Sequence, residues 1–453
     1  MLKRFMNPVK ETTTEENAML TKYNFRRLGL VAMMAGFVAA CDNPLAVKAP
    51  GVLTADELTG PGAIGSVVNG IVGDFAEALD NYVLYTSMFT DEMILAGTFP
   101  TRKEVDERRI VPDNATVTGG LYEPIHVSRF SADTAAVNFS AAQSDPDFAA
   151  VLDLLDEGTV YAKFYGGYSR ILLAELYCES TLSAGPFLVS DDRMTEAMNL
   201  LAEAEADAAA AGLDDIENAA IVGQARANLW LGNYTAAAAH AARVDAGFEY
   251  HQAYSTNDNV QFNEVYSLTH GRGGQVIRWT VGDGTLASRN FEKFAYYDEW
   301  VALGRINPAS GKRSFDSTIP VRLQLLYASG DAGILLASKA EADMIEAEAA
   351  IRAGQFTTAD DLVNPYRSAW GLTDLDFGAM ANLNARLTQL AQERNREMWL
   401  TGERQGTLRR LLENDGLDLY PANGGAGTQT CFPIVQQELD NNSNSLNFPA
   451  NQQ

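Results

Sequence analysis

The stretch AAIVGQARANLWLGNYTAAAAHAARV, residues 219–244, decides the fold because it predicts two helices separated by one glycine. A second stretch, LLASKAEADMIEAEAAIRAGQFTTADDLV at residues 335–363, repeats this arrangement. Small residues crowd the helices of the first stretch, and the second keeps apolar residues on one helical face. The members of that face are Leu336, Ala340, Met344, Ala347 and Ile351. Both stretches therefore predict helix hairpins.

The two breaks share a spacing of glycine, any residue, an aromatic residue, two further residues and alanine. The residues that fit it are Gly232, Tyr234 and Ala237 in the first stretch and Gly354, Phe356 and Ala359 in the second. This spacing resembles the tetratricopeptide hairpin, in which glycine permits the turn, the aromatic residue fills the space between the helices, and alanine lets the second helix pack. Two matches in register are more specific than one.

The rest of the chain is also predicted to be mainly helical. Helical patterns cover residues 61–95, 121–141, 146–178 and 191–211. Residues 97–118 are predicted to form a basic loop, and about 250–335 form an irregular, aromatic excursion with short strand-like pieces such as 274–280. We expect a mostly α fold, a tetratricopeptide-like helix-hairpin superhelix, in which residues 61–453 form one domain with a loop-rich insertion and minor β structure.

The N-terminal segment is typical of an export leader. Leu28–Ala40 carries no charge, follows Arg26 and Arg27, and is too short to span a bilayer as a helix. It ends in Val-Ala-Ala-Cys41, which resembles a bacterial lipobox. We expect the signal peptide to lie within residues 1–40, with Met19 as the true start of the protein. We expect Cys41 to take acyl chains such as palmitate, with 41–60 as a lipidated tether. The alternative is an ordinary secretory leader.

The net charge and the scarcity of cysteine and histidine argue against some classes of ligand. The chain has 34 Lys and Arg against 59 Asp and Glu, which gives a net charge of −25. Such a charge disfavours binding to nucleic acid or anionic lipid. The sequence contains no Cys-x-x-Cys and no His-x-x-x-His, so we expect no zinc site and no cofactor. After Cys41 only Cys178 and Cys431 remain, and they either form a disulfide in an oxidising compartment or stay as two buried thiols.

The C-terminal part of the chain carries the most distinctive pattern. Residues 392–411 read QERNREMWLTGERQGTLRRL, and the chain closes with Phe432-Pro433-Ile434-Val435, followed by Glu438 and Asn441. Together with the lipobox and the hairpins, this pattern resembles the SusD/RagB family of outer-membrane nutrient-binding lipoproteins. The chain departs from the family pattern at Gln405-Gly406-Thr407, where an aromatic residue and an aspartate are usual, and at Val435, where a proline is usual.

The resemblance implies a function as well as a fold. It implies a lipid-anchored protein of the outer membrane, exposed at the cell surface, that binds nutrient oligomers, glycan or peptide. It also implies delivery of these ligands to a TonB-dependent, SusC-like outer-membrane transporter, and no enzymatic activity. The alternative is a tetratricopeptide-type scaffold lipoprotein for envelope assembly, which would favour uninterrupted repeats.

A secreted hydrolase is the weakest interpretation. Glu393 and Glu397 share one helical face, but Arg394 continues an apolar stripe and should be buried with a carboxylate partner. Glu397, one turn away, is the nearest candidate for that partner. We therefore expect a structural ion pair here instead of a pair of catalytic carboxylates. No nucleophile elbow, phosphate loop or dinucleotide fingerprint follows a predicted strand.

Two segments are candidates for ligand contact. A carbohydrate site needs aromatic faces beside polar side chains, and residues 289–300 offer Arg289, Asn290, Tyr296 and Trp300. The alternative for these rings is a small additional core. The second segment, residues 99–103, offers Phe99 and Arg102 in a loop, or else forms an ordinary solvated surface.

Overall fold

The computed structural model describes residues 60–257, 261–271, 273–277, 297–315, 317, 321–421 and 427–447. The chain divides into two units, Met1–Leu58 and Thr59–Gln453, and the fold below is that of the second unit. Cys41 and the ligand candidates Arg289, Asn290 and Tyr296 lie outside the described residues. Within the described ranges, no helix is long and apolar enough to cross a membrane.

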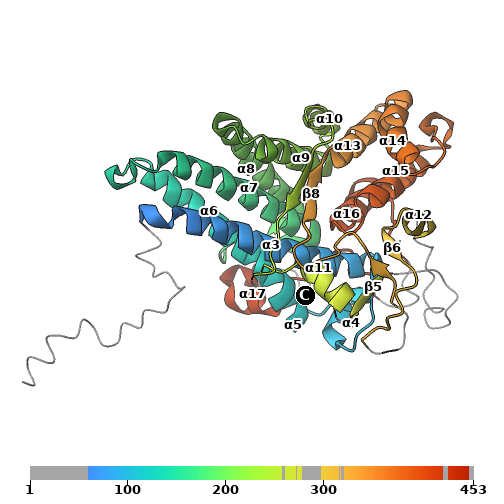
Figure 1. Cartoon of the computed structure of the whole chain (residues 1–453), viewed down its shortest axis with the longest axis horizontal. Helices are drawn as coiled ribbons and strands as arrows, with labels where there is room; N and C mark the ends of the chain where they lie inside the picture. Colours follow the sequence, from blue (N-terminus) through green and yellow to red (C-terminus); the bar gives the residue numbers. More distant parts are fainter. Residues whose placement is uncertain are drawn as a thin grey trace, which may run out of the picture. The chain divides into compact units, whose positions relative to one another are not determined.

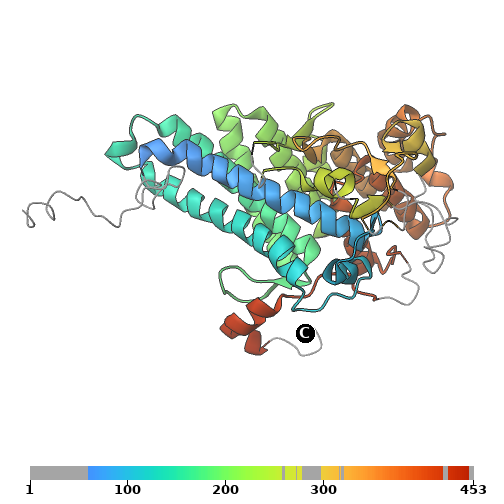
Figure 2. The ribbon, with the colours of Figure 1, turned by 60° about the horizontal axis from the view of Figure 1, so that its bottom comes forward.

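Antiparallel helices that pack on their neighbours in sequence build most of the fold. Contacts run from α6 to α7, α8, α9 and α10 in turn, and α3 packs on α6 and α7. Figure 2 shows α3 lying along α6. These helices are α3 (Ile64–Phe89), α6 (Glu123–Ala142), α7 (Leu152–Leu176), α8 (Ser190–Ala211), α9 (Asp214–Trp230) and α10 (Tyr234–Ala241).

The second predicted hairpin packs directly on the first. Helix α10 contacts α13, although the whole insertion separates them in sequence, and α13 continues to α14 and α15. Figure 1 shows this row of helices extending from α8 to α15. The bounds are α13 (Lys339–Arg352), α14 (Phe356–Ala369), α15 (Leu383–Glu397) and α16 (Glu403–Asp415). The prediction of a mostly α, tetratricopeptide-like fold is therefore confirmed.

Both hairpin turns have the expected backbone. Gly232 and Gly354 have φ of 73° and 75°, in the left-handed region that side chains disfavour. Ala237 and Ala359, three residues into each second helix, are fully buried, which is what close helix packing requires.

The aromatic residues of the hairpins behave differently from the expectation. Tyr234 and Phe356 are only half-buried at the edge of each hairpin. An arginine side chain stacks on each ring. The guanidinium carbon of Arg352 lies 4.3 Å from the centroid of the Tyr234 ring, and that of Arg386 lies 4.2 Å from the centroid of the Phe356 ring. Cation–π contact thus replaces part of the expected packing between helices.

The insertion is held at its base by a short antiparallel ladder. Strand β4 (Glu249–Gln252) pairs with β8 (Ile334–Ser338) where the chain leaves and re-enters the helical array. Strand β1 (Met93–Leu95) pairs with β5 (Gln275–Ile277), which lies within the strand predicted at 274–280. Two further pairs join β2 (Glu179–Ser180) to β3 (Leu188–Val189) and β6 (Ile306–Asn307) to β7 (Leu323–Gln324).

The prediction of a loop over residues 97–118 is wrong for half of that segment. It contains α4 (Pro100–Asp106), the short α5 (Ala115–Val117) and the start of a π-helical turn, η2 (Thr118–Tyr122). Pro100 suits a first helical position, and the Asn114 side chain accepts from the Val117 backbone N–H at 3.0 Å. These helix-start signals explain why α4 and α5 form, although the basic composition of the segment had favoured a loop.

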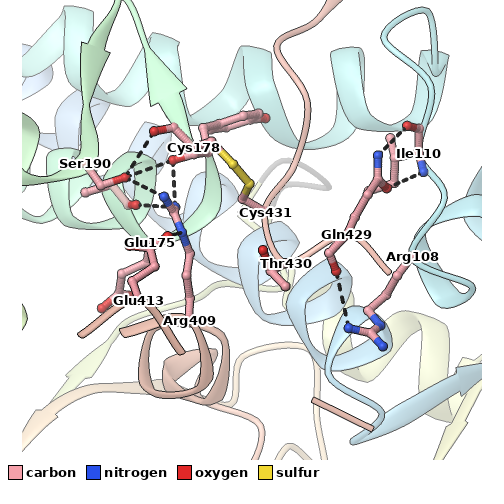
Figure 3. Close-up of a disulfide and its surroundings, with 12 residues drawn as sticks. Arg108, Ile110, Glu175, Cys178, Ser190, Arg409, Glu413, Gln429, Thr430 and Cys431 are labelled. Carbon is pink, nitrogen blue, oxygen red and sulfur yellow. Dashed lines mark hydrogen bonds and ion pairs between the residues drawn. A yellow bond between two sulfur atoms is a disulfide. The ribbon is translucent and has the colours of Figure 1, made fainter. Parts of the chain in front are cut away.

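A disulfide fastens the C-terminal segment to α7. Cys178, just after α7, is bonded to Cys431, with the two Cα atoms 5.5 Å apart (Figure 3). Beside it, the Phe432 N–H donates to the Leu176 carbonyl at 2.9 Å. The Gln429 side chain bonds both backbone groups of Ile110, at 2.6 Å and 2.9 Å. The segment therefore ties α7 to the chain that leaves α4.

Charged residues of the C-terminal pattern form ion pairs inside the fold. Arg394 is buried, as expected, but its Nη2 lies 3.2 Å from Glu403 Oε2 and does not pair with Glu397. Glu397 instead accepts from the Trp370 indole N–H. The correction has a geometric reason, because Gly402 has φ of 90° and turns the chain so that α16 begins against α15.

A buried cluster of charged side chains centres on Arg226 of α9. Its guanidinium makes two hydrogen bonds to Glu175 of α7, at 2.7 Å and 2.6 Å, and lies 3.7 Å from Glu341 of α13. The Tyr82 hydroxyl of α3 donates to Glu175 at 2.8 Å. Gly406 is required beside this carboxyl group, since a Cβ there would lie 2.5 Å from Glu175 Cδ. The absence of a side chain at Gly406 therefore makes room for Glu175.

Protonation balances the charge of this cluster. Three carboxyl groups, of Glu175, Glu341 and Glu403, meet two guanidinium groups, of Arg226 and Arg394. Burial raises the pKa of Glu341 well above its ordinary value, and the neighbouring Glu403 carboxylate adds to the shift. A proton on Glu341 leaves two negative charges facing two positive ones.

Glu348 lies two helical turns further along α13 and has the opposite chemistry. It accepts two hydrogen bonds of 2.6 Å from Arg410 and further bonds from Arg352. Burial alone would raise the pKa of Glu348, but these two guanidinium groups lower it to about 2. The side chain is therefore a paired carboxylate.

These two buried glutamates of α13 should respond differently to amidation. We expect Glu341→Gln to cost less than about 1 kcal/mol of unfolding free energy at pH 7, because it replaces one neutral group by another. Glu348→Gln should cost about 3 kcal/mol or more, since it leaves the buried Arg410 guanidinium without its carboxylate partner and removes one of the two partners of Arg352, which keeps Asp415. Urea unfolding of both variants measures the difference, and equal losses would contradict the assignment.

A second buried carboxyl group controls how stability depends on pH. Glu92 lies between α3 and β1, and burial raises its pKa to about 7 although Arg404 opposes the shift. The native state thus holds this proton more tightly than the unfolded chain, so stability is full below the ordinary pKa of 4.5 and is lost as the pH rises through about 7.

Glu92→Gln should remove this loss. Between pH 5 and pH 8, the variant should gain about 2.5 kcal/mol in unfolding free energy relative to the wild type. Glu249→Gln, at an exposed position, is the control and should follow the wild type. Parallel stability curves for Glu92→Gln and the wild type across this range would show that Glu92 is ionised in the fold.

Candidate functional site

A surface edge forms where α3 ends and the chain turns through β1 into α4. The Ala96 N–H donates to the Gly274 carbonyl at 2.9 Å, and the Phe315 N–H donates to the Gly273 carbonyl at 3.0 Å. Gly97 lies against the backbone of Gly274. We call this surface the β1–β5 edge and define it as Ala96–Arg102, Gly273–Gln275 and Lys312–Phe315. Figure 1 shows α4, β5 and α11 at this end of α3.

Two phenylalanine rings are exposed at the β1–β5 edge. Phe99 is 47% exposed and immediately precedes α4, where an extended backbone presents it before Pro100 begins the helix. The Arg102 guanidinium carbon lies 5.1 Å from the Phe99 centroid. Phe315 is 57% exposed in the turn that reaches Gly273. Exposed rings of this kind can pack on apolar faces of a ligand.

An imidazole and a phenol stack beside the edge. Tyr266 ends α11 (Glu264–Tyr266) and His270 belongs to the π-helical turn η4 (Ser267–Gly271); their ring centroids are 4.9 Å apart at an interplanar angle of 25°. π-Helical turns are frequent at functional sites. The Lys312 ammonium donates to the His270 carbonyl at 3.0 Å, which joins this stack to the β1–β5 edge.

The His270 ring is held neutral. Burial lowers its pKa, and the Lys312 ammonium lowers it further. Its Nδ1 lies 3.3 Å from the Gln324 amide nitrogen, whose orientation is fixed because Gln324 Oε1 accepts from the Tyr327 N–H at 2.8 Å. The stack therefore offers an uncharged polar face next to the exposed rings.

The structure separates the sequence-based candidates. It places Phe99 and Arg102 together on the surface, but Trp300 of α12 (Tyr297–Ala302) is fully buried. The Trp300 ring packs 4.1 Å from Trp399 and 5.3 Å from Trp370, so it forms core and cannot contact a ligand. The expectation for Trp300 was wrong because helical spacing does not distinguish an exposed ring from a buried one. Arg289, Asn290 and Tyr296 lie outside the described residues.

Several residues at this surface were not found from the sequence. Phe315, Tyr266, His270 and Lys312 come from segments far from residue 99, and only the folded chain brings them together. The sequence held one signal for this surface. Residues 311–315 read GKRSF, which combines a turn-forming glycine, two cations and an aromatic ring.

The side chains at this surface are suited to holding a ligand. Rings, a neutral imidazole and cations can hold a ligand by stacking and hydrogen bonding. Across the described ranges, no group of three or more His, Cys, Asp or Glu side chains could hold a metal ion.

Solved structures resemble this fold, whereas no family model and no curated protein matches the sequence. A SusD superfamily protein from Bacteroides thetaiotaomicron superposes with a TM-score of 0.61 at 14% identity, over 85% of this chain and 97% of that chain. One from Parabacteroides distasonis gives 0.60 at 12% identity, over 87% and 98%.

A third structure carries a functional description. It is a SusD-like carbohydrate binding protein from Bacteroides vulgatus, with a TM-score of 0.56 at 14% identity over 78% of this chain and 83% of that chain. Identity is low in every case, so these likenesses concern the fold. Together with the hairpins and the helix order, they show that this chain has the SusD-like fold.

Proposed function

We propose that this protein is a surface lipoprotein that binds carbohydrate oligomers and delivers them to a TonB-dependent outer-membrane transporter. The observation that carries the proposal is the pair of exposed rings, Phe99 and Phe315, at one edge of a SusD-like fold. The sequence pattern around Cys41 and the resemblance to the SusD/RagB family support the anchoring and the delivery.

Carbohydrate fits the β1–β5 edge better than peptide does. Sugar rings combine apolar C–H faces with a rim of hydroxyl groups, which suits Phe99 and Phe315 flanked by polar side chains. A peptide bound as an added strand would need a free strand edge of useful length, whereas β1 and β5 have three residues each. The carbohydrate-binding description of one structural neighbour points in the same direction.

A lipid anchor would keep such a binding protein close to the transporter that receives its ligand. Acyl chains on Cys41 would hold it at the membrane that contains the transporter. Tethering raises the effective concentration of each partner near the other, so a weak mutual affinity suffices. A ligand held at the protein surface then needs only a short transfer.

A scaffold for envelope assembly is the second candidate, and one feature favours it. Val127, Phe130 and Val137 are exposed along one face of α6, and such apolar stripes often mark protein contacts. This surface lies on a different helix from the β1–β5 edge, so variants can separate the two functions.

Removing the exposed rings tests the ligand site. Phe99→Ala combined with Phe315→Ala should weaken binding of an oligosaccharide by about 2 kcal/mol, roughly 30-fold, without loss of stability. Calorimetric titration with glycan and peptide panels measures this. Phe130→Ala is the matched control, because Phe130 is 56% exposed and is also covered by an arginine, Arg129. Unchanged binding in the double variant would remove the β1–β5 edge as the site.

Changing the anchor tests the lipoprotein and its partner. Cys41→Ser should leave the protein unlipidated and in the soluble fraction, because no thiol remains to carry the acyl chains. A TonB-dependent transporter should co-purify with the wild-type protein when it is crosslinked in native membranes. Membrane attachment of Cys41→Ser through acyl chains, or wild-type purification without any transporter, would contradict the proposal.

A further inference from the structure

The charge around the β1–β5 edge is opposite to that of the chain as a whole. The protein has a net charge of −25, yet residues 300–330 contain Arg305, Lys312, Arg313 and Arg322 and one acidic residue, Asp316. Lys312 and Arg313 are exposed in the turn that presents Phe315. Arg102, beneath Phe99, adds a cation from α4.

Three of these cations, Arg102, Lys312 and Arg313, differ from the paired cations elsewhere in the described part of the chain. On α4 the neighbouring Lys103 lies 3.6 Å from Glu107, and the buried Arg226 and Arg410 have carboxylate partners in the core. By contrast, Arg102, Lys312 and Arg313 form no ion pair with any residue in the part of the chain that the structure describes.

Their contacts leave the charge available. Lys312 donates to the His270 carbonyl at 3.0 Å, and Arg313 donates to the Ser317 carbonyl at 3.3 Å. Arg102 lies over the face of Phe99. These contacts orient the three side chains without neutralising them, so each can still pair with an anion.

We propose that the ligand is an anionic oligosaccharide, whose rings pack on Phe99 and Phe315 and whose carboxylate or sulfate groups pair with Arg102, Lys312 and Arg313. This inference rests on the proposed function and specifies its ligand class. The acidic remainder of the surface repels such a ligand, so the β1–β5 edge is where it can approach. Guanidinium groups are suited to planar carboxylate and to sulfate.

Matched ligands test the charge of the oligosaccharide. Calorimetry with the protein starting after Cys41 compares oligogalacturonate with neutral oligogalactoside of equal length, and sulfated with unsulfated dextran oligomers. At least one anionic ligand should bind about tenfold or more tighter than its neutral match, and raising NaCl from about 50 to 500 mM should weaken it at least fivefold. The two arms show whether carboxylate or sulfate is recognised.

Variants locate the interaction. Lys312→Gln combined with Arg313→Gln should weaken the anionic ligand about tenfold and leave the neutral match unchanged. Arg243→Gln is the control for net charge, because Arg243 is exposed and pairs with Glu205 away from this edge. It should bind like the wild type.

Two failures can be distinguished. Equal binding of charged and neutral ligands, insensitive to salt and to Lys312→Gln with Arg313→Gln, overturns the inference and leaves the proposed function in place. Absence of binding to every glycan, charged or neutral, overturns both. Equal weakening by Arg243→Gln shows that overall charge and not this edge is responsible, which also overturns the inference.

Discussion

The buried cluster around Arg226 is the interaction on which the other features depend. It brings together Glu175 of α7, Glu341 of α13 and Glu403 of α16, with Tyr82 of α3 bonded to Glu175. Burying several charges costs free energy unless each finds a partner in good geometry. The helices that carry them can therefore pack in few ways, and segments more than three hundred residues apart are fixed against one another.

This requirement explains the chemistry of the C-terminal pattern. Its glutamates and arginines were expected to be structural and not catalytic, and their partners lie within the fold, as with Arg394 and Glu403 or Arg410 and Glu348. The pattern therefore builds the scaffold, and the ligand surface lies elsewhere. The disulfide and the Gln429–Ile110 bonds extend this rigid base to the chain that follows α4, and Phe99 immediately precedes that helix.

Sequence reasoning succeeded where the determining residues are close together. The turns at Gly232 and Gly354, with their packed alanines, follow from spacing within six residues. It failed where a partner comes from a distant segment. Arg394 pairs across the Gly402 turn instead of with Glu397 one helical turn away, and Trp300 is buried because Trp399, ninety-nine positions later, packs on it.

The candidate site shows the same limit. Phe99 and Arg102 could be proposed from their local composition. The β1–β5 edge, however, forms through contacts between distant segments, because Ala96 bonds the Gly274 carbonyl and Phe315 bonds the Gly273 carbonyl. The central claim is that the buried ion pairs build the fold while the ligand binds separately, at the β1–β5 edge. A crystal structure with a bound oligosaccharide tests this claim most directly. We expect the sugar rings to lie against Phe99 and Phe315; a ligand bound along α6, with this edge empty, would contradict it.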